Sequence, residues 1–119
     1  MDILLISSRA EELAAFATEL AAGGAAVSVV PSGAAALSAV ASAVPTLCVV
    51  DEELPDMKSF ALVARLMQAN ALMHTAVVSG LSDEEFHEAG EGLGILRRLP
   101  GAPGASEARE LLAALAAVS

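Results

Sequence analysis

The sequence predicts a three-layer α/β fold, in which a parallel five-stranded sheet in the order 2-1-3-4-5 carries helices on both faces. Short apolar runs alternate strictly along the chain with Ala-rich segments of helical composition. The runs are continuous rather than alternating, so each expected strand is apolar on both faces and must be covered on both faces. Right-handed crossovers between successive parallel strands then make a doubly wound sheet the simplest architecture.

The five expected strands share a high content of Ile, Val and Leu and are bounded by Gly, Pro, Ser or charged residues. They are residues 3–6, 26–30, 47–50, 76–78 and 93–96. The loop after the fifth strand is expected at residues 97–100. Because parallel strands end at one edge of the sheet, the loops that follow them are where a functional crevice is expected.

The helices between these strands are predicted from apolar spacing and from their start and stop signals. The first covers residues 9–22 and ends at Gly23-Gly24, and the second runs from an N-cap at Ser32 to about Ala43, before Pro45. The third covers residues 58–70, the fourth begins at a Ser82/Glu85 capping box and closes at Gly90 and Gly92, and the fifth opens at Ser106 or Gly104. The expected core faces are Leu13, Phe16 and Leu20, then Phe60, Val63, Leu66 and Met67, and finally Leu111, Leu112 and Leu115.

Composition excludes several classes of protein. The 119 residues suit a single domain over 1–119, and 55% hydrophobic residues with 18% charged exclude general disorder. A net charge of −9 and only three aromatic residues disfavour direct binding of nucleic acid. No apolar stretch reaches the ~18 to 20 residues needed to cross a bilayer. The lone Cys48 rules out a disulfide framework, and with no secretory signal at the N-terminus we expect a cytoplasmic protein.

Asp51 is the main candidate for chemistry, because it directly follows the apolar strand 47–50 and therefore stands at the edge of the sheet. An aspartyl oxygen in such a place suits a nucleophile toward phosphorus, provided that a cation offsets the charge. The alternative is a strand-terminating acid in a solvated acidic turn. Spacing alone favours that alternative, since acids after strands are common.

Three segments together resemble the receiver domain of bacterial two-component response regulators. They are residues 3–6, residues 45–51 with 54–57, and residues 75–80. The resemblance covers nearly the whole chain and implies a flavodoxin-like fold. It places Asp51 at the position that accepts a phosphoryl group from a histidine kinase, Ser79 at the hydroxyl position that senses the phosphoryl oxygen, and Gly80 at the small residue beside it.

The chain departs from the receiver pattern at the residues that would hold a metal ion. Two acids after the first strand are replaced by Ser7 and Ser8, and Glu53 is the remaining group in this degenerate acidic pocket. Magnesium binds poorly without carboxylates. We therefore expect no divalent ion beside Asp51 and no cofactor.

Two further positions of the receiver pattern have changed. Leu99 stands where receivers carry a lysine, and Arg98 is displaced by one residue, which reverses the direction of a side chain on a strand. The alternative is that a shifted loop lets Arg98 take the role of this lysine. Lys58-Ser59 replaces the usual Asp-Gly pair, and Lys58 is interpreted as a solvated residue of the first helical turn. The alternative is that Lys58 neutralises Asp51 or Asp56.

Other sequence patterns give weaker evidence for a functional site. His74 and His87 have no Cys or Asp at metal-ligand spacing, and the Gly-rich segment 90–94 precedes a strand instead of linking a strand to a helix, which argues against a phosphate loop. Ser7, Ser8 and Ser79 have no evident base.

Three functions remain, in this order. The first is a receiver-like module for protein interaction in which phosphorylation at Asp51 is lost or weakened, and the second is a competent phosphoacceptor assisted by Ser7, Ser8 and Glu53. The third is a small α/β enzyme of unknown substrate, although we expect no enzymatic activity. Whether the chain is a whole regulator or one domain of a longer protein stays open.

The expected partner is a histidine kinase or another signalling protein. The fourth helix is strongly acidic, with Arg97 and Arg98 near its edge, so a basic partner could bind there. Its acids are Asp83, Glu84, Glu85 and Glu88. The alternative is a solubilising helix whose first turn suits the helix dipole. A homodimer is left open.

Overall fold

The computed structural model describes residues 1–118, and these form a five-stranded parallel sheet with helices in strict alternation. The strands are β1 Asp2–Ile6, β2 Ala26–Val30, β3 Leu47–Val50, β4 His74–Val78 and β5 Arg97–Leu99. The helices are η1 Ala10–Leu13, α1 Ala14–Ala22, α2 Gly33–Ser42, α3 Ser59–Ala69, α4 Asp83–Ala89 and α5 Ala105–Val118. The strand order β2-β1-β3-β4-β5 confirms the predicted fold class.

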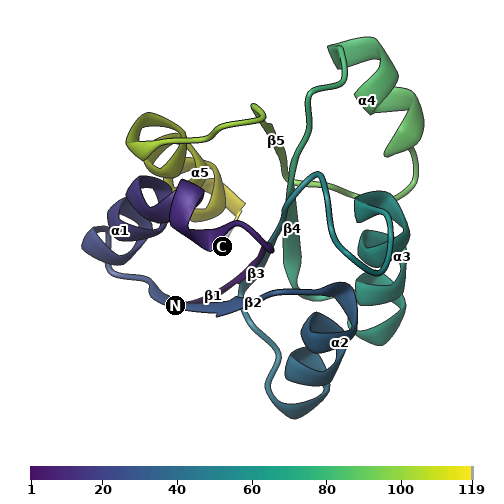
Figure 1. Ribbon diagram of the computed structural model, residues 1–119, viewed down its shortest axis with the longest axis horizontal. Helices are drawn as coiled ribbons and strands as arrows, with labels where there is room; N and C mark the ends of the chain where they lie inside the picture. Colours follow the sequence, from purple (N-terminus) through teal and green to yellow (C-terminus); the bar gives the residue numbers. More distant parts are fainter. Residues whose placement is uncertain (119) are drawn as a thin grey trace.

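The sheet lies between two layers of helices, as Figure 1 shows. One face is covered by α1 and α5, around Phe16, Leu20, Leu111 and Leu115. The other face is covered by α2 and α3, where Val40, Leu62 and other apolar residues pack against β1 and β3. The two-sided core follows from the continuous apolar strands, because every residue of β3 is buried.

The predicted helices occur with small shifts at their ends. The first predicted helix is a 3₁₀ turn, η1, that continues into α1. Ser32 caps α2 by accepting a hydrogen bond from the Ala35 N–H, and the capping box of Ser82 and Glu85 begins α4. The predicted core faces are buried or half-buried, with Leu112 among the half-buried residues.

The predicted strand at 93–96 is wrong, because β5 comprises Arg97–Leu99 instead. Gly92 and Gly94 have positive φ angles of 80° and 63°, which break an extended conformation. Leu93 and Ile95 are apolar because they pack as loop residues against the core beneath α3 and α4. Arg97 and Arg98 therefore belong to the strand and not to the loop after it.

Among residues 1–118, no helix combines the length and the apolar character that crossing a membrane would need.

Thr75 provides a test of the packing of β4. Its side chain is buried, and its hydroxyl has no hydrogen-bond partner among the described residues. Because an unpaired buried hydroxyl costs about 1–3 kcal/mol, we expect Thr75→Val to raise the free energy of unfolding by about 1 kcal/mol. Urea denaturation measures the change. The control is Thr18→Val on the exposed side of α1, for which we expect little effect. A loss of stability in Thr75→Val would contradict the unpaired hydroxyl.

Candidate functional site

Asp51 lies at the carboxyl edge of the sheet, directly after β3, and is fully buried, whereas Glu52 and Glu53 are exposed. Its backbone N–H donates to the carbonyl oxygen of Ile6 at 3.0 Å, so the end of β3 is fixed against the end of β1. A buried carboxylate is costly unless it is paired and hydrogen-bonded. The surroundings of Asp51 therefore decide what it can do.

Arg9 supplies the opposite charge. Its Nε donates to Oδ2 of Asp51 and its Nη2 donates to Oδ1, both at 2.8 Å, which is the two-pronged contact that a guanidinium makes with a carboxylate. The Nη2 group also donates to the carbonyl oxygen of Gly101 at 2.6 Å. Arg9 thus links the loops after β1, β3 and β5.

Two further donors complete the carboxylate's hydrogen bonds. The Ser7 hydroxyl donates to Oδ2 at 2.7 Å, and the backbone N–H of Glu52 donates to Oδ1 at 2.8 Å. The Ser7 hydroxyl in turn accepts from the backbone N–H of Arg9 at 3.0 Å, which fixes its orientation. Each carboxylate oxygen of Asp51 therefore accepts two hydrogen bonds, one of them from Arg9.

These contacts set the charge state of the pair. Burial by itself would raise the pKa of Asp51, but the hydrogen bonds from Arg9, Ser7 and Glu52, together with the charge of Arg9, lower it below its ordinary value. The hydrogen bond to Asp51 raises the pKa of Arg9 further above its already high value. Both groups are therefore charged at neutral pH.

Arg9 was missed by the sequence analysis. One signal could have found it: when Ser7 and Ser8 replace acids, no metal site remains to neutralise a buried Asp51, so a cation of the chain itself must do so. Arg9 is the first basic residue after that gap in the sequence.

Neither Ser79 nor Gly80 makes a hydrogen bond with Asp51 in the described part of the chain. Ser79 is buried, and its hydroxyl accepts from the backbone N–H of Leu81 at 3.2 Å. The Gly80 N–H donates to Oε2 of Glu52 at 3.0 Å. These residues line a pocket of about 280 Å³ that also includes Glu53 and does not include Asp51. The pocket beside the buried aspartate thus presents two carboxylates.

The remaining predicted site residues lie elsewhere. Ser8 and Glu53 are exposed, and Leu99 is buried in the core beneath α1 and α5. Arg98 pairs with Asp83 of α4 at 2.6 Å, so its guanidinium is engaged away from Asp51. Lys58 is exposed, immediately before α3.

The donor set around Asp51 does not fit a divalent cation. The guanidinium of Arg9 lies against both carboxylate oxygens, and the neighbouring oxygen from β1 is a hydroxyl instead of a carboxylate. Magnesium requires charged oxygen ligands to offset its dehydration. In the described part of the chain, no three His, Cys, Asp or Glu side chains come together as a metal site.

Asp56 has a structural contact that the sequence analysis also missed. Its carboxylate accepts from the backbone N–H groups of Gly33 and Ala34, both at 2.9 Å, at the N-terminus of α2. These hydrogen bonds lower the pKa of Asp56. A Cβ at Gly33 would lie 2.5 Å from the sulfur of Met57, so any larger residue here would require the Met57 side chain to move. The acidic loop after β3 is thereby anchored to α2.

No protein-family model matches the sequence, and no curated protein matches it either. Solved structures do. The receiver domain of NtrX from Brucella abortus is similar over 99% of this chain and 100% of that chain, with a TM-score of 0.86 and 18% identity. A CheY-like response regulator receiver domain protein from Methanospirillum hungatei is similar over 98% of this chain and 91% of that chain, with a TM-score of 0.82 and 19% identity.

A third similar structure is a response regulator from Burkholderia pseudomallei, described as carrying a phosphorylated aspartic acid, a calcium ion and citrate. The similarity covers 96% of this chain and 65% of that chain, with a TM-score of 0.80 and 20% identity. This chain therefore has the CheY-like fold of response regulator receiver domains, and the expected resemblance is confirmed at the level of the fold.

Removing the cation from this pair tests how much it stabilises the fold. Arg9→Met keeps an apolar stem but leaves the buried Asp51 carboxylate unpaired, so we expect the free energy of unfolding at neutral pH to fall by about 3 kcal/mol. Adding Asp51→Asn to this variant removes the unpaired charge and should restore part of the loss. Urea denaturation of the three proteins measures both effects, and an unchanged midpoint in Arg9→Met would contradict the pairing.

The same pair predicts a pH dependence. Because the folded-state pKa of Asp51 is lowered, its contribution to stability is fully present above the unfolded-state pKa of about 4 and is lost as pH falls through the folded-state value. Below about pH 4, the free energy of unfolding of the wild type should therefore fall relative to that of Asp51→Asn. Denaturation at a series of pH values measures this shift. A difference that does not depend on pH would contradict it.

Proposed function

We propose that this chain is a cytoplasmic, receiver-like module of a two-component phosphorelay system that acts through protein interaction, with phosphorylation at Asp51 impaired. The observation that carries the proposal is the ion pair in which Arg9 occupies both carboxylate oxygens of Asp51. The fold supports a signalling role over a catalytic one. The buried Cys48, whose pKa burial raises to about 12, is an unreactive thiol and fits a reducing compartment.

The chemistry of phosphoryl transfer explains why the ion pair impairs it. A carboxylate attacks phosphorus with a free oxygen lone pair, while cations offset the negative charge of the transferred group. Each oxygen of Asp51 already accepts two hydrogen bonds, and attack would require the Arg9 contact to open. The neighbouring pocket presents Glu52 and Glu53, whose charge opposes the approach of an anionic phosphoryl donor.

The alternative is a competent phosphoacceptor modified on Asp51 by a histidine kinase. The similar protein from Burkholderia pseudomallei is described with a phosphorylated aspartic acid. Asp51 is charged in this chain, as a nucleophile must be. Its hydrogen-bond partners include no general base, which leaves the third reading, a small enzyme, without support.

A histidine kinase or another signalling protein is the partner that this proposal implies, and α4 is the surface that we propose for a basic one. Two of its acids have partners within the chain, since Asp83 pairs with Arg98 and Glu85 belongs to the capping box. Glu84 and Glu88 are exposed, and within residues 1–118 their side chains form no ion pair, unlike that of Asp83. These two carboxylates are the ones available to a basic partner.

Incubation with acetyl phosphate and Mg²⁺, followed by intact mass measurement, tests the impaired phosphorylation. We expect the wild type to keep its unmodified mass, because Arg9 and not a metal ion neutralises Asp51. The matched control is Asp51→Asn, which lacks the acceptor. An added phosphoryl mass in the wild type that is absent in Asp51→Asn would overturn the proposal in favour of the competent phosphoacceptor.

A Mg²⁺ titration tests the site without any phosphoryl donor. Following the amide resonances of residues 7, 8, 51 and 53, we expect no saturable shift at millimolar Mg²⁺, because the β1 side of the site offers only hydroxyl oxygens. Saturable shifts at low-millimolar Mg²⁺ that disappear in Asp51→Ala would show that this expectation is wrong.

A further inference from the structure

The two edge strands of the sheet differ in how they are protected. Along β5, Arg97 pairs with Glu110 at 3.4 Å and Arg98 pairs with Asp83 at 2.6 Å. Charged side chains on an edge strand discourage pairing with another chain. The other edge, β2, has the sequence Ala-Val-Ser-Val-Val, with no charge, no proline and an unbroken five-residue register with β1. It lacks the devices that normally keep an edge strand from pairing.

The backbone of β2 leaves two residues free to pair outward. The Ala26 N–H donates to the carbonyl oxygen of Met1 at 2.8 Å, and the Val30 carbonyl accepts from the Ser7 N–H at 3.0 Å. Because alternate residues of a parallel strand bond to the same neighbour, residues 26, 28 and 30 face β1. The N–H and C=O groups of Val27 and Val29 therefore point away from the sheet, and Val29 is 47% exposed.

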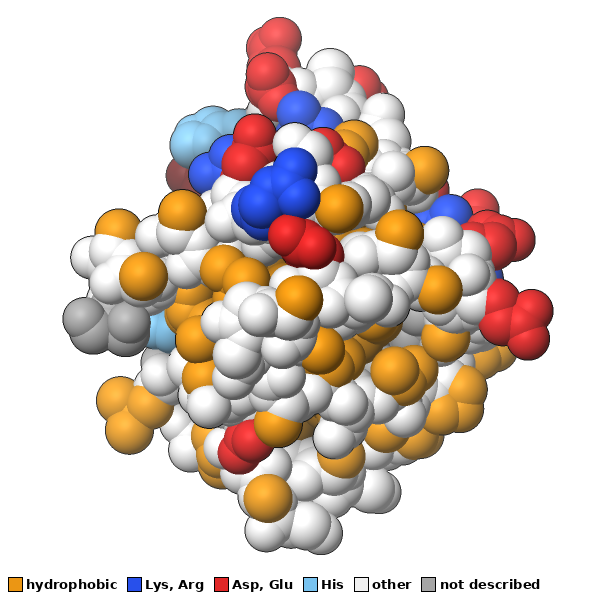
Figure 2. Space-filling view, turned by 90° about the vertical axis from the view of Figure 1, so that its left-hand side faces the viewer, with side chains coloured by type: hydrophobic (Ala, Val, Ile, Leu, Met, Phe, Trp, Pro, Cys, Tyr) orange, Lys and Arg blue, Asp and Glu red, His pale blue; other side chains and the backbone are white. Residues whose placement is uncertain are grey.

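The chain segment that contains β2 carries no charge, and the nearest acid on the neighbouring strand is Asp2, which lies beside Ala26 at the start of β1. No Asp, Glu, Lys, Arg or His occurs from Leu20 to Val50, a segment that contains both β2 and α2, while the chain as a whole has a net charge of −9. Figure 2 shows the same unevenness on another face, where charged side chains gather at the top and along the right margin and the lower part is largely hydrophobic or neutral. Two copies of this acidic chain repel least where both are neutral.

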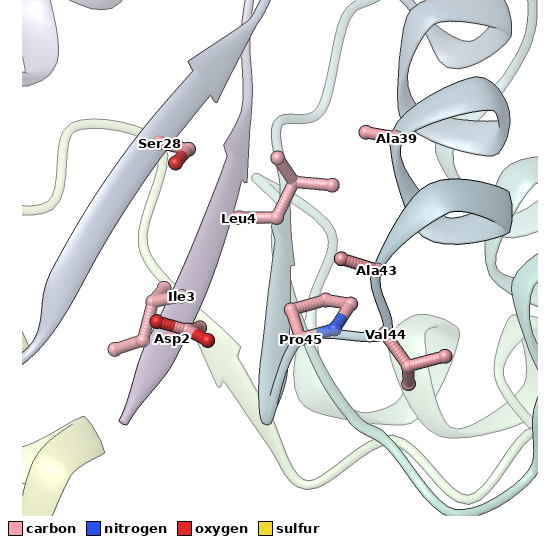
Figure 3. Close-up of a pocket in the computed structure, with 8 residues that line it drawn as sticks. All are labelled: Asp2, Ile3, Leu4, Ser28, Ala39, Ala43, Val44 and Pro45. Carbon is pink, nitrogen blue, oxygen red and sulfur yellow. The ribbon is translucent and has the colours of Figure 1, made fainter.

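The space beside β2 is also open. A pocket of about 320 Å³ lies between β1 and the C-terminal half of α2, where the side chains of Leu4, Ala39 and Ala43 approach one another and Ser28 faces in from β2 (Figure 3). The exposed residues of α2 are all small, namely Ala34, Ser38, Ala41 and Ser42. None of these side chains is long enough to hold a second sheet edge away from β2.

We propose that β2 is a dimerisation edge, and that a second copy of this chain adds its own β2 antiparallel to it about a two-fold axis at Ser28. This register places Val27 opposite Val29 of the partner subunit, and the reverse by symmetry. In an antiparallel ladder such pairs exchange both N–H···O=C bonds, so all four outward N–H groups and all four outward carbonyl groups of the two strands are satisfied. The product is one continuous sheet from two copies.

The choice of a second copy over another partner rests on charge and on symmetry. An uncharged strand has no group that would favour a basic or an acidic ligand. Two copies of a strongly acidic chain, in contrast, repel each other least when they meet through their uncharged strands. The two-fold axis runs perpendicular to the sheet, so the α2 helices of both copies lie on the same face of the joined sheet. Their small exposed residues then allow close approach, which extends the contact beyond the two strands. The proposal does not depend on whether Asp51 accepts a phosphoryl group.

Sedimentation equilibrium over a range of protein concentrations tests the dimer. We expect the wild type to dimerise, and Val29→Lys to weaken the dimer by about tenfold or more by setting two like charges near the axis. Val29→Pro removes the outward N–H of this residue without adding a charge and should weaken the dimer in the same way. Leu72→Lys is the matched control, since it adds the same charge at an exposed apolar residue before β4, three strands away from β2.

Hydrogen exchange provides a second measurement on the wild type. We expect the amides of Val27 and Val29 to be protected at high protein concentration and to exchange rapidly at low concentration. A chain that remains monomeric throughout would overturn the proposal. So would a dimer that survives both Val29 variants, or one that Leu72→Lys weakens equally.

Discussion

The carboxyl edge of this protein depends on one constraint, which is that the buried carboxylate of Asp51 must be neutralised inside the chain. Arg9 meets it with two hydrogen bonds to the carboxylate and a third to the Gly101 carbonyl. Since Ser7 and Glu52 add the remaining donors, the loops after β1, β3 and β5 are held by a single charged centre. The network is fully satisfied, and such networks fix one arrangement of the groups they join.

An internal cation differs from a metal ion in one physical respect: it cannot dissociate from the protein. A bound metal ion links the arrangement of its ligands to its concentration, whereas Arg9 stays tethered two residues beyond Ser7 whatever the solution contains. The contacts of Arg9 that join these loops therefore do not require a metal ion from solution.

The sequence predicted the first four strands from their continuous apolar runs. In β1, β3 and β4 these runs reflect burial on both faces, which is complete in β3, whereas β2 is an apolar edge strand that stays partly exposed. It misplaced β5 because Leu93 and Ile95 are apolar loop residues that pack against the core, whereas the real strand begins with two arginines on an exposed edge. Asp51 was identifiable from its place after β3. Arg9 was not, because its contact with Asp51 spans 42 residues and depends on a side chain folding back over the edge. Local patterns report burial well, whereas the partner of a buried charge is set by tertiary structure.

The distribution of charge divides the surface into two regions with different consequences. The acids of α4 and the arginines of β5 lie at one edge of the sheet, and the uncharged segment from Leu20 to Val50 includes the strand at the opposite edge. The partner proposed for the first region would be steered by electrostatics and weakened by salt, whereas the dimer proposed at the second would depend on backbone hydrogen bonds and apolar contact, which salt screens little. Because the strand order places β1, β3 and β4 between these edges, a partner on α4 and a second copy on β2 do not compete for the same surface. The fold thus allows both contacts at once, each governed by a different interaction.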